Sequence, residues 1–209
     1  MNDTTNQVEN EVRETVESGV DIYERVRTIT LKALTERTLD TENIKSVMEA
    51  VLKGMSEGIS RNYDPAKHAF QQSADALDDA LTKAAEASKL AIEEASSNAE
   101  EFSEHDFKKA LEDLQSLEQL FLETMEKMGR QSNETVSKIT DDFLAHVRQS
   151  GTSVGRQSQV ILENLDNLRS SGQNAVISSA QATGSALAKI ASGFLAGIAE
   201  SLHPEKPEK

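Results

Sequence analysis

The sequence has no cysteine and no tryptophan, and only three prolines in 209 residues. Without cysteine the chain cannot form disulfides, thiolate metal sites or iron–sulfur clusters, and it has no cysteine nucleophile. The prolines are Pro65, Pro204 and Pro207, so residues 66–203 contain none. Aromatic residues make up only 4% of the chain. Because folds rich in loops or β-strands need more turn residues than this, the composition favours an all-α protein.

The charge is strongly acidic and unevenly distributed. With 36 acidic and 22 basic residues the formal net charge is −14. Such a chain repels a phosphate backbone, so we expect no nucleic-acid partner. Residues 151–209 contain five basic and five acidic side chains, so the whole net charge lies in residues 1–150. The sequence therefore predicts an acidic helical bundle or coiled-coil region over 1–150 and a neutral, Ala/Gly/Ser-rich amphipathic helix over 151–203. Because Pro204 ends that helix, we expect residues 204–209 to form a disordered tail.

The N-terminal residues carry neither a basic segment nor an apolar one. A secretory signal peptide needs both, so none is expected. A chain without cysteine is also compatible with a reducing compartment. These two observations predict a cytoplasmic protein.

Apolar residues recur at spacings of three and four along five segments with no proline in their interiors, which predicts five amphipathic helices. An unbroken fourth helix would be about 70 Å long at 1.5 Å per residue. Helices of that length, with seams rich in small residues that one slender chain can hardly bury, predict an elongated bundle or coiled coil that oligomerises. The expected helices cover about residues 6–37, 40–59, 65–99, 103–150 and 154–203.

Glycine and proline mark three positions along these helices. The run Asn62-Tyr63-Asp64-Pro65 predicts a helix start, since proline fits the first turn. Gly54 and Gly58 lie beside the apolar stripe of the second helix, where they indicate either a close helix approach or a frayed helix end. The segment Gly151–Gly155 is the expected bend before the last helix.

Gly151-Thr152-Ser153-Val154-Gly155 also matches G-x-S-x-G, the nucleophile elbow of α/β-hydrolases. That elbow requires a strand before the serine, and helices are expected on both sides here. Glu200 and His203 form an isolated E-x-x-H, whereas di-iron bundles need two such motifs and two further glutamates. No phosphate-binding glycine loop is present. We therefore expect no enzyme activity, no cofactor, no metal and no small-molecule substrate.

The C-terminal region carries an apolar stripe with a weakly polar opposite face. Residues 175–199 contain one charge, Lys189, and 15 apolar residues, fewer than a bilayer span of about 20 requires. The stripe fills an arc of about 140° on a helical wheel, wider than a coiled-coil seam. We expect it to lie on an apolar surface or to be buried in an oligomer. The residues predicted to bind are Leu187, Ile190, Phe194, Leu195, Ile198 and Leu202.

Several segments resemble an uncharacterised, all-helical bacterial protein family, which brings no assigned activity with it. In its size, its Ala/Gln/Ser-rich helices and its few aromatic residues, the chain is also similar to phasins, which coat polyhydroxyalkanoate granules. The segments that carry the first resemblance are Arg25–Arg27, Thr30–Leu34, Lys83–Ser88, Glu101–Asp106 and Ala191–Gly197.

Two functions remain open at this point. The first is a non-enzymatic scaffold or coat that docks its C-terminal amphipathic helix on a polymer granule or on lipid. The second is a coiled-coil adaptor that uses the same stripe only for protein–protein contacts. In the first, the acidic region would face water and keep coated particles apart by repulsion between like charges.

Overall fold

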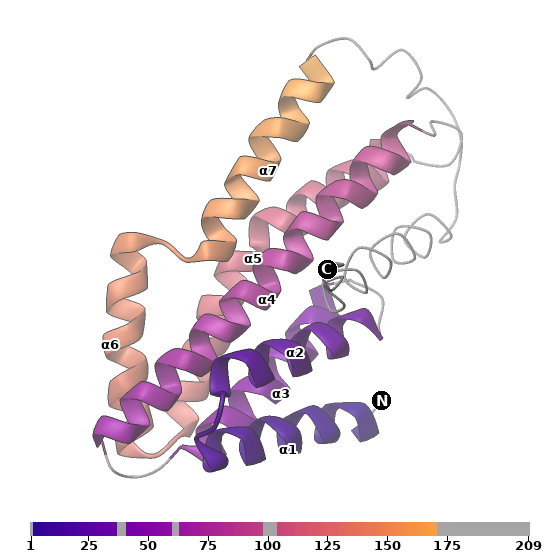
Figure 1. Cartoon of the computed structure of the whole chain (residues 1–209). Coiled ribbons are helices and arrows are strands. Elements are labelled where there is room, and N and C mark those ends of the chain that lie inside the picture. Colours follow the sequence, from indigo (N-terminus) through magenta and orange to yellow (C-terminus); the bar gives the residue numbers. More distant parts are fainter. Residues whose placement is uncertain (1, 37–40, 60–62, 98–103, 171–209) are drawn as a thin grey trace, which may run out of the picture.

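The computed structural model describes residues 2–36, 41–59, 63–97 and 104–170 (Figure 1). These residues form seven α-helices and no strand, which confirms the predicted all-α class. In chain order the helices are α1 (Asn2–Ser18), α2 (Ile22–Thr35), α3 (Thr41–Gly58), α4 (Tyr63–Ser97), α5 (Glu104–Gln131), α6 (Glu134–Ser150) and α7 (Ser153–Ser170).

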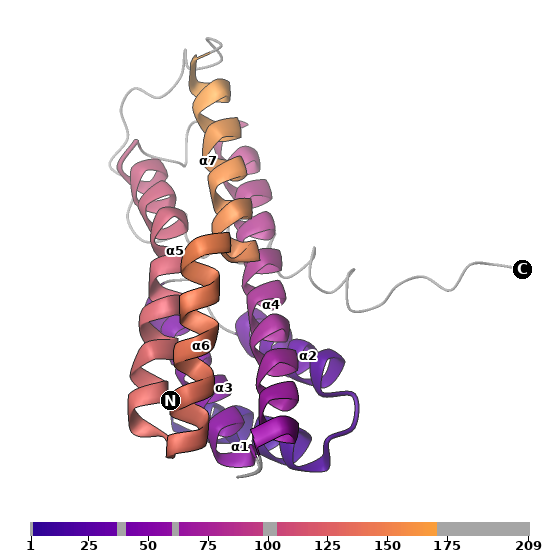
Figure 2. The ribbon, with the colours of Figure 1, turned by 90° about the vertical axis from the view of Figure 1, so that its left-hand side faces the viewer.

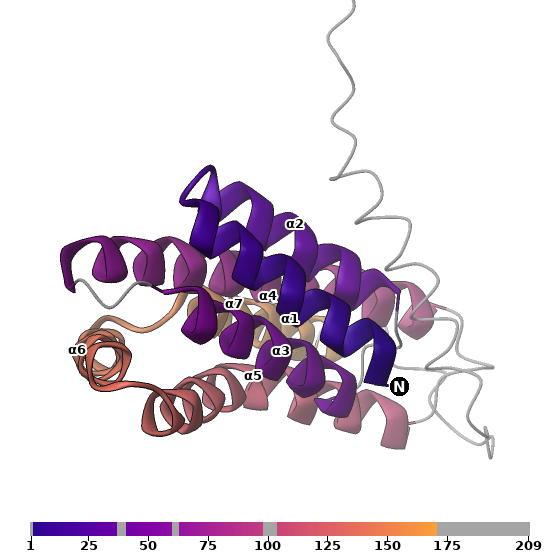
Figure 3. The same cartoon turned by 90° about the horizontal axis from the view of Figure 1, so that it is seen from below.

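The longest helix, α4, runs through the bundle, and other helices pack around it (Figures 1 and 2). α1 packs mainly on α3, α2 packs on α4, and α7 packs on both α4 and α5. α1 and α2 lie side by side when the bundle is viewed from below (Figure 3). Among the described helices, α4, α5 and α7 extend toward one end of the molecule, away from α1 (Figure 1).

The apolar stripe predicted on the second helix is confirmed on α3. Every residue of that stripe is buried, whereas Lys45, Lys53 and Glu57 on the opposite side are exposed. An apolar stripe buried on one side and charges on the other are what an amphipathic helix at the surface of a core requires. The buried stripe consists of Ile44, Val47, Met48, Val51, Leu52, Met55 and Ile59.

The single helix predicted over residues 6–37 is wrong, because the chain turns between α1 and α2. Gly19 has φ +67° and Asp21 has φ +49°, both in the left-handed region. Glycine adopts that region freely, and aspartate tolerates it better than most residues. The chain reverses there, so α2 runs back beside α1 (Figure 3). Val20, predicted on the buried seam, lies in this turn and is 58% exposed.

The single helix predicted over residues 103–150 is also wrong, because α5 ends at Gln131 and α6 begins at Glu134. Asn133 has an extended backbone, and its side-chain oxygen accepts a hydrogen bond from Val136 N at 3.2 Å. That bond is a typical N-cap, and it starts a new helix in a new direction. With 28 residues, α5 is about 42 Å long rather than 70 Å.

The small-residue seam predicted on the third helix is confirmed on α4, with Phe70, Ala74, Leu77, Leu81 and Ala84 all buried. These five residues are buried within this one chain, Ser88 is half-buried, and the side chains of Ala91, Ala95 and Ala99 lie outside what the structure describes. The ring of Phe70 meets that of Phe143 on α6 edge to face, with centroids 5.6 Å apart.

The two interpretations of Gly54 and Gly58 are resolved in favour of a close helix approach. A Cβ atom on Gly54 would lie 2.3 Å from the carbonyl oxygen of Glu9, and one on Gly58 would lie 2.7 Å from that of Arg13. Both carbonyls belong to α1. α1 and α3 therefore touch through their backbones, which only glycine permits at these positions.

Candidate functional site at the α6–α7 junction

The G-x-S-x-G segment forms the turn between α6 and α7. Gly151 has φ +72° and its N–H donates to Val147 O at 2.8 Å, which ends α6. α7 begins two residues later at Ser153. The bend predicted here is confirmed, and helices flank the serine on both sides. The strand that a nucleophile elbow requires is therefore replaced by a helix in this structure.

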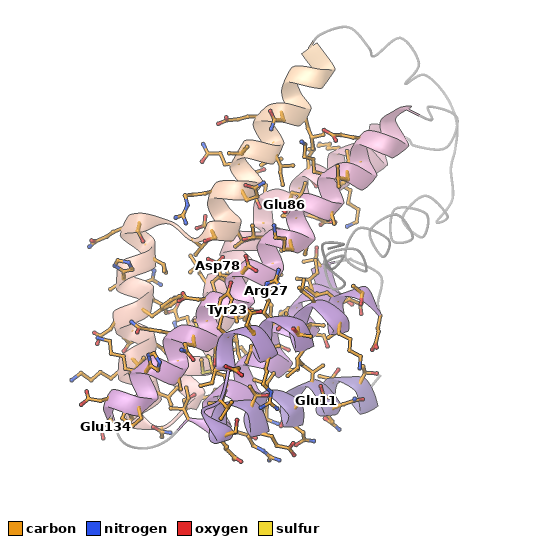
Figure 4. The ribbon with its side chains drawn as sticks, viewed as in Figure 1. Glu11, Tyr23, Arg27, Asp78, Glu86 and Glu134 are labelled. Atoms are coloured by element: carbon orange, nitrogen blue, oxygen red, sulfur yellow. The ribbon has the colours of Figure 1, made fainter. Side chains whose placement is uncertain are left out.

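A carboxylate from α4 holds the first turn of α7. Asp78 Oδ2 accepts a hydrogen bond from Ser153 N at 2.7 Å, and Asp78 Oδ1 accepts one from Val154 N at 2.9 Å. The first N–H groups of a helix have no partner within the helix, and they carry its positive end. A carboxylate bound through both oxygens satisfies two of them and complements that charge. Figure 4 shows Asp78 on the side of α4 that faces this junction.

A second carboxylate, from α5, holds the residue before the helix. Glu118 Oε1 accepts hydrogen bonds from Thr152 N at 3.0 Å and from Thr152 Oγ1 at 2.8 Å. Thr152 Oγ1 in turn accepts from Gly155 N at 2.9 Å, which makes Thr152 the N-cap of α7. A Cβ atom on Gly155 would lie 2.2 Å from Cδ of Glu118, so glycine makes room for this carboxylate. We call Asp78, Glu118 and Thr152 the carboxylate clasp.

The hydroxyl of Ser153 is not set up as a nucleophile. Asp78 binds the backbone N–H of Ser153, and Ser153 Oγ accepts a hydrogen bond from Arg156 Nη2 at 3.2 Å. A guanidinium only donates hydrogen bonds, whereas activation of a serine needs a base that takes its proton. The geometry of the clasp positions a helix, and each residue of the motif has a role in that task.

A second polar cluster joins α2 to α4 next to the clasp (Figure 4). Arg27 Nε donates to Asp79 Oδ2, and the side chains are 20% and 32% exposed. The hydrogen bond to Asp79 raises the pKa of Arg27. Partial burial, and then the charge of Asp79, raise the pKa of Tyr23.

One further carboxylate faces this region. Partial burial of its carboxyl group, followed by repulsion from Asp78, raises the pKa of Asp75, although the residue as a whole is largely exposed. Asp75, Asp78 and Asp79 thus place three acidic side chains within about one turn of α4. The Asp78 carboxylate binds the N-terminus of α7, and Asp79 pairs with Arg27 of α2. The cluster therefore links α4 to both of these helices.

The histidines considered from sequence are dispersed. His68 is exposed and its Nε2 lies 3.0 Å from Gln72 Nε2, and His146 is exposed on α6. The side chain of His105 and the whole of His203 lie outside what the structure describes. Within the described ranges, no group of three or more His, Asp and Glu side chains is arranged to hold a metal ion.

All six residues predicted to bind a surface or partner lie outside the described residues. They are Leu187, Ile190, Phe194, Leu195, Ile198 and Leu202. In the part of the chain that is described, no helix is both long enough and apolar enough to cross a membrane.

The sequence analysis missed both acidic residues of the clasp. Glu118 follows Leu114 by four residues and precedes Phe121 by three, so it occupies a seam position of an amphipathic helix. A carboxylate on an apolar seam is the signal that could have identified it. Asp78 gave a weaker signal, because it stands beside the seam next to Leu77.

Comparison with known proteins identifies a family and no activity. No curated protein matches the chain. No solved structure matches it either. The likeness to phasins finds no support in these comparisons. The model of one family, described as a family of unknown function (DUF6781), matches residues 1–204. Since this match covers nearly the whole sequence, the chain belongs to the DUF6781 family.

Proposed function

We propose that the protein is a non-enzymatic cytoplasmic scaffold or coat protein that docks its C-terminal amphipathic segment on an apolar surface. The surface is a polymer granule or lipid. A cytoplasmic location agrees with the absence of cysteine. The docking stripe consists of Leu187, Ile190, Phe194, Leu195, Ile198 and Leu202.

The observation that carries the proposal is that the helices of the described bundle already pack on one another. α1 packs on α3, α2 on α4, and α7 on α4 and α5, and their apolar stripes form one core cluster. The docking stripe has the same spacing as those stripes, and it follows the bundle in the sequence. A stripe of hydrophobic residues outside the main core cluster is typical of a segment with a binding partner.

The charge distribution supports the same function. The acidic bundle holds the whole net charge of −14, whereas residues 151–209 are neutral. Burying apolar area lowers the free energy of a neutral amphipathic segment, whereas the charged surface of the bundle is stabilised by contact with water. We therefore expect binding to uncharged apolar surfaces and weak binding to anionic lipid, which repels the bundle.

The test is the substitution Phe194→Glu in the full chain. A charge in the middle of the stripe should abolish co-sedimentation with polyhydroxybutyrate particles or flotation with phosphatidylcholine vesicles, and these two probes separate granule from lipid. Ser192→Glu, on the weakly polar face, is the matched control and should bind as the wild type does. Molecular mass in solution, measured by light scattering, should be the same in all three proteins.

The alternative is a coiled-coil oligomerisation or adaptor module that acts only through protein contacts. It uses the same stripe, so Phe194→Glu would then lower the molecular mass in solution. If the wild type binds neither particles nor vesicles and Phe194→Glu dissociates an oligomer, the alternative replaces the coat function.

A further inference from the structure

The described side chains of α3, α4 and α5 leave an apolar cavity between them. It is partly open to the surface and has a volume of about 50 Å³. Its apolar walls come from Ile44, Ile92, Leu114, Leu117 and Leu120. A cavity of this size and lining suits the end of one aliphatic or aromatic side chain.

The polar groups at the cavity already have hydrogen-bond partners. Thr41 Oγ1 donates to Asp113 Oδ1 at 2.9 Å. Ser88 Oγ donates to Ala84 O at 2.9 Å, and Ser116 Oγ donates to Asp113 O at 2.9 Å. A polar ligand would have to compete with these bonds, whereas a hydrocarbon group would leave them intact. The chemistry of the cavity therefore selects an apolar occupant.

Charge selects among apolar occupants. The cavity belongs to the region of the chain that carries the net charge of −14. A second copy that docked through its own bundle would bring the same charge against it. Residues 187–202 carry one basic and one acidic side chain, Lys189 and Glu200, so they bring no net charge to the acidic bundle.

The chain geometry brings that segment within reach. α7 ends at Ser170, toward the end of the molecule where α4 ends and α5 begins (Figures 1 and 2). An extended chain covers about 3.3–3.6 Å per residue, so the 17 residues from Ser170 to Leu187 can span up to about 61 Å. That exceeds the length of α7 itself, about 27 Å for 18 residues. A tethered segment also has an effective concentration in the millimolar range, which favours it over a second copy.

We propose that in the absence of an apolar surface the docking stripe at residues 187–202 packs back on its own bundle, with one side chain in the cavity between α3, α4 and α5. This contact is autoinhibitory, because the same stripe cannot bind the bundle and an apolar surface together. The inference rests on the proposed function for the identity of the stripe and extends it by a regulatory step.

The experiment is amide hydrogen exchange, read over residues 187–202 of the full-length protein at two concentrations. The variant Ala110→Phe fills the cavity from its half-buried wall on α5. Lys108→Phe places the same ring two residues away, at a side chain that is 76% exposed, and is the matched control. Ser116→Leu is a second filling variant from the same wall, in case Ala110→Phe disturbs the fold.

We expect the wild type and Lys108→Phe to show protection over 187–202, and the filling variants to lose it. Particle binding should then strengthen, because the apparent affinity is proportional to the fraction of molecules whose stripe is free. A stripe docked nine-tenths of the time binds about tenfold more weakly, and filling the cavity should restore that factor.

Three results would overturn the inference. The wild type could show no protection, the filling variants could keep it, or protection could rise with protein concentration, which would mean that a second copy is the occupant. Failure of the proposed function is a separate result. If the filling variants lose protection and no variant binds particles or vesicles, the docking stands and the coat function falls.

Discussion

Two interfaces of the bundle position a helix by different means. α1 and α3 approach so closely at Gly54 and Gly58 that their backbones touch, and Val12 and Val16 beside them are buried. α7 buries Val154, Ile161 and Leu165, but its first turn is fixed by the carboxylate clasp. The α1–α3 contact depends on shape, whereas the start of α7 depends on directional hydrogen bonds to charged groups.

The difference has consequences for stability. A contact made by shape tolerates changes of salt and pH, but it fails when one methyl group is added to a wall of backbone atoms. A contact made by carboxylates tolerates small changes of volume and fails when charge or hydrogen-bonding capacity is lost. The α7 interface also buries the hydroxyl of Ser158, which lacks a hydrogen-bond partner within the described residues. We therefore expect α7 to open more readily than α1.

The largest effect should come from Gly54→Ala. In an open helix this change stabilises by about 1 kcal/mol, because alanine has the higher helix propensity. Here the added Cβ would lie 2.3 Å from Glu9 O, so we expect a net loss of about 2–3 kcal/mol from overpacking. Urea denaturation measures this loss. Glu57→Ala, at an exposed position of α3, is the control and should stay within about 0.5 kcal/mol of the wild type. A gain of stability in Gly54→Ala would show that the two backbones do not touch.

The next effect should come from Asp78→Ala, which removes the acceptor of two hydrogen bonds at the start of α7. Loss of an N-terminal cap with charged hydrogen bonds costs about 2 kcal/mol. Because the loss is local, amide exchange should accelerate more in α7 than in α1. Asp78→Asn keeps one acceptor oxygen and should cost about half as much. Equal acceleration in both helices would mean that Asp78 contributes only to global stability.

Helical periodicity correctly predicted most of the buried residues that the structure describes, with Val20 as an exception. The stripe of α3 and the seam of α4 lie in the core as expected, and the bend at Gly151 is where the glycines indicated. Periodicity did not reveal where a helix reverses. Val16 and Tyr23 keep helical spacing across Gly19–Asp21, so the pattern is the same whether the chain continues or turns.

The second missed break has a similar cause. Met128 and Val136 are both buried, so the apolar spacing continues across the break, although α5 ends at Gln131 and α6 begins at Glu134. Apolar periodicity shows which residues share one face of a helix, but it does not show whether the chain continues in the same direction. The clasp was missed for a related reason, because Asp78 and Glu118 become neighbours of Thr152 only after three helices have packed together.

A smaller effect is expected at the ion pair of Arg27 and Asp79, which joins α2 to α4 beside the clasp. A double-mutant cycle with Arg27→Gln and Asp79→Asn should give a coupling energy of about 1 kcal/mol, since both side chains are partly buried. The pair Lys108–Glu112 is the control, with side chains 76% and 64% exposed at a distance of 3.8 Å. Its coupling should be about 0.3 kcal/mol and should vanish in high salt. Equal couplings would show that partial burial adds nothing to the Arg27 pair.

The smallest effect concerns Asp75, whose charge opposes the clasp. Partial burial and then Asp78 raise the pKa of Asp75 in the folded protein, so folding takes up a proton between the ordinary Asp value of about 3.9 and the raised value. The contribution of Asp75 to stability is therefore highest below the ordinary value and falls as the pH rises through the raised pKa. Asp75→Asn removes this loss, and it also relieves the repulsion on Asp78. We expect a small increase in Tm at pH 7 that disappears near pH 3, and calorimetry at both pH values measures it. An equal increase at both would mean that the new amide stabilises through hydrogen bonds of its own rather than through the loss of a charge.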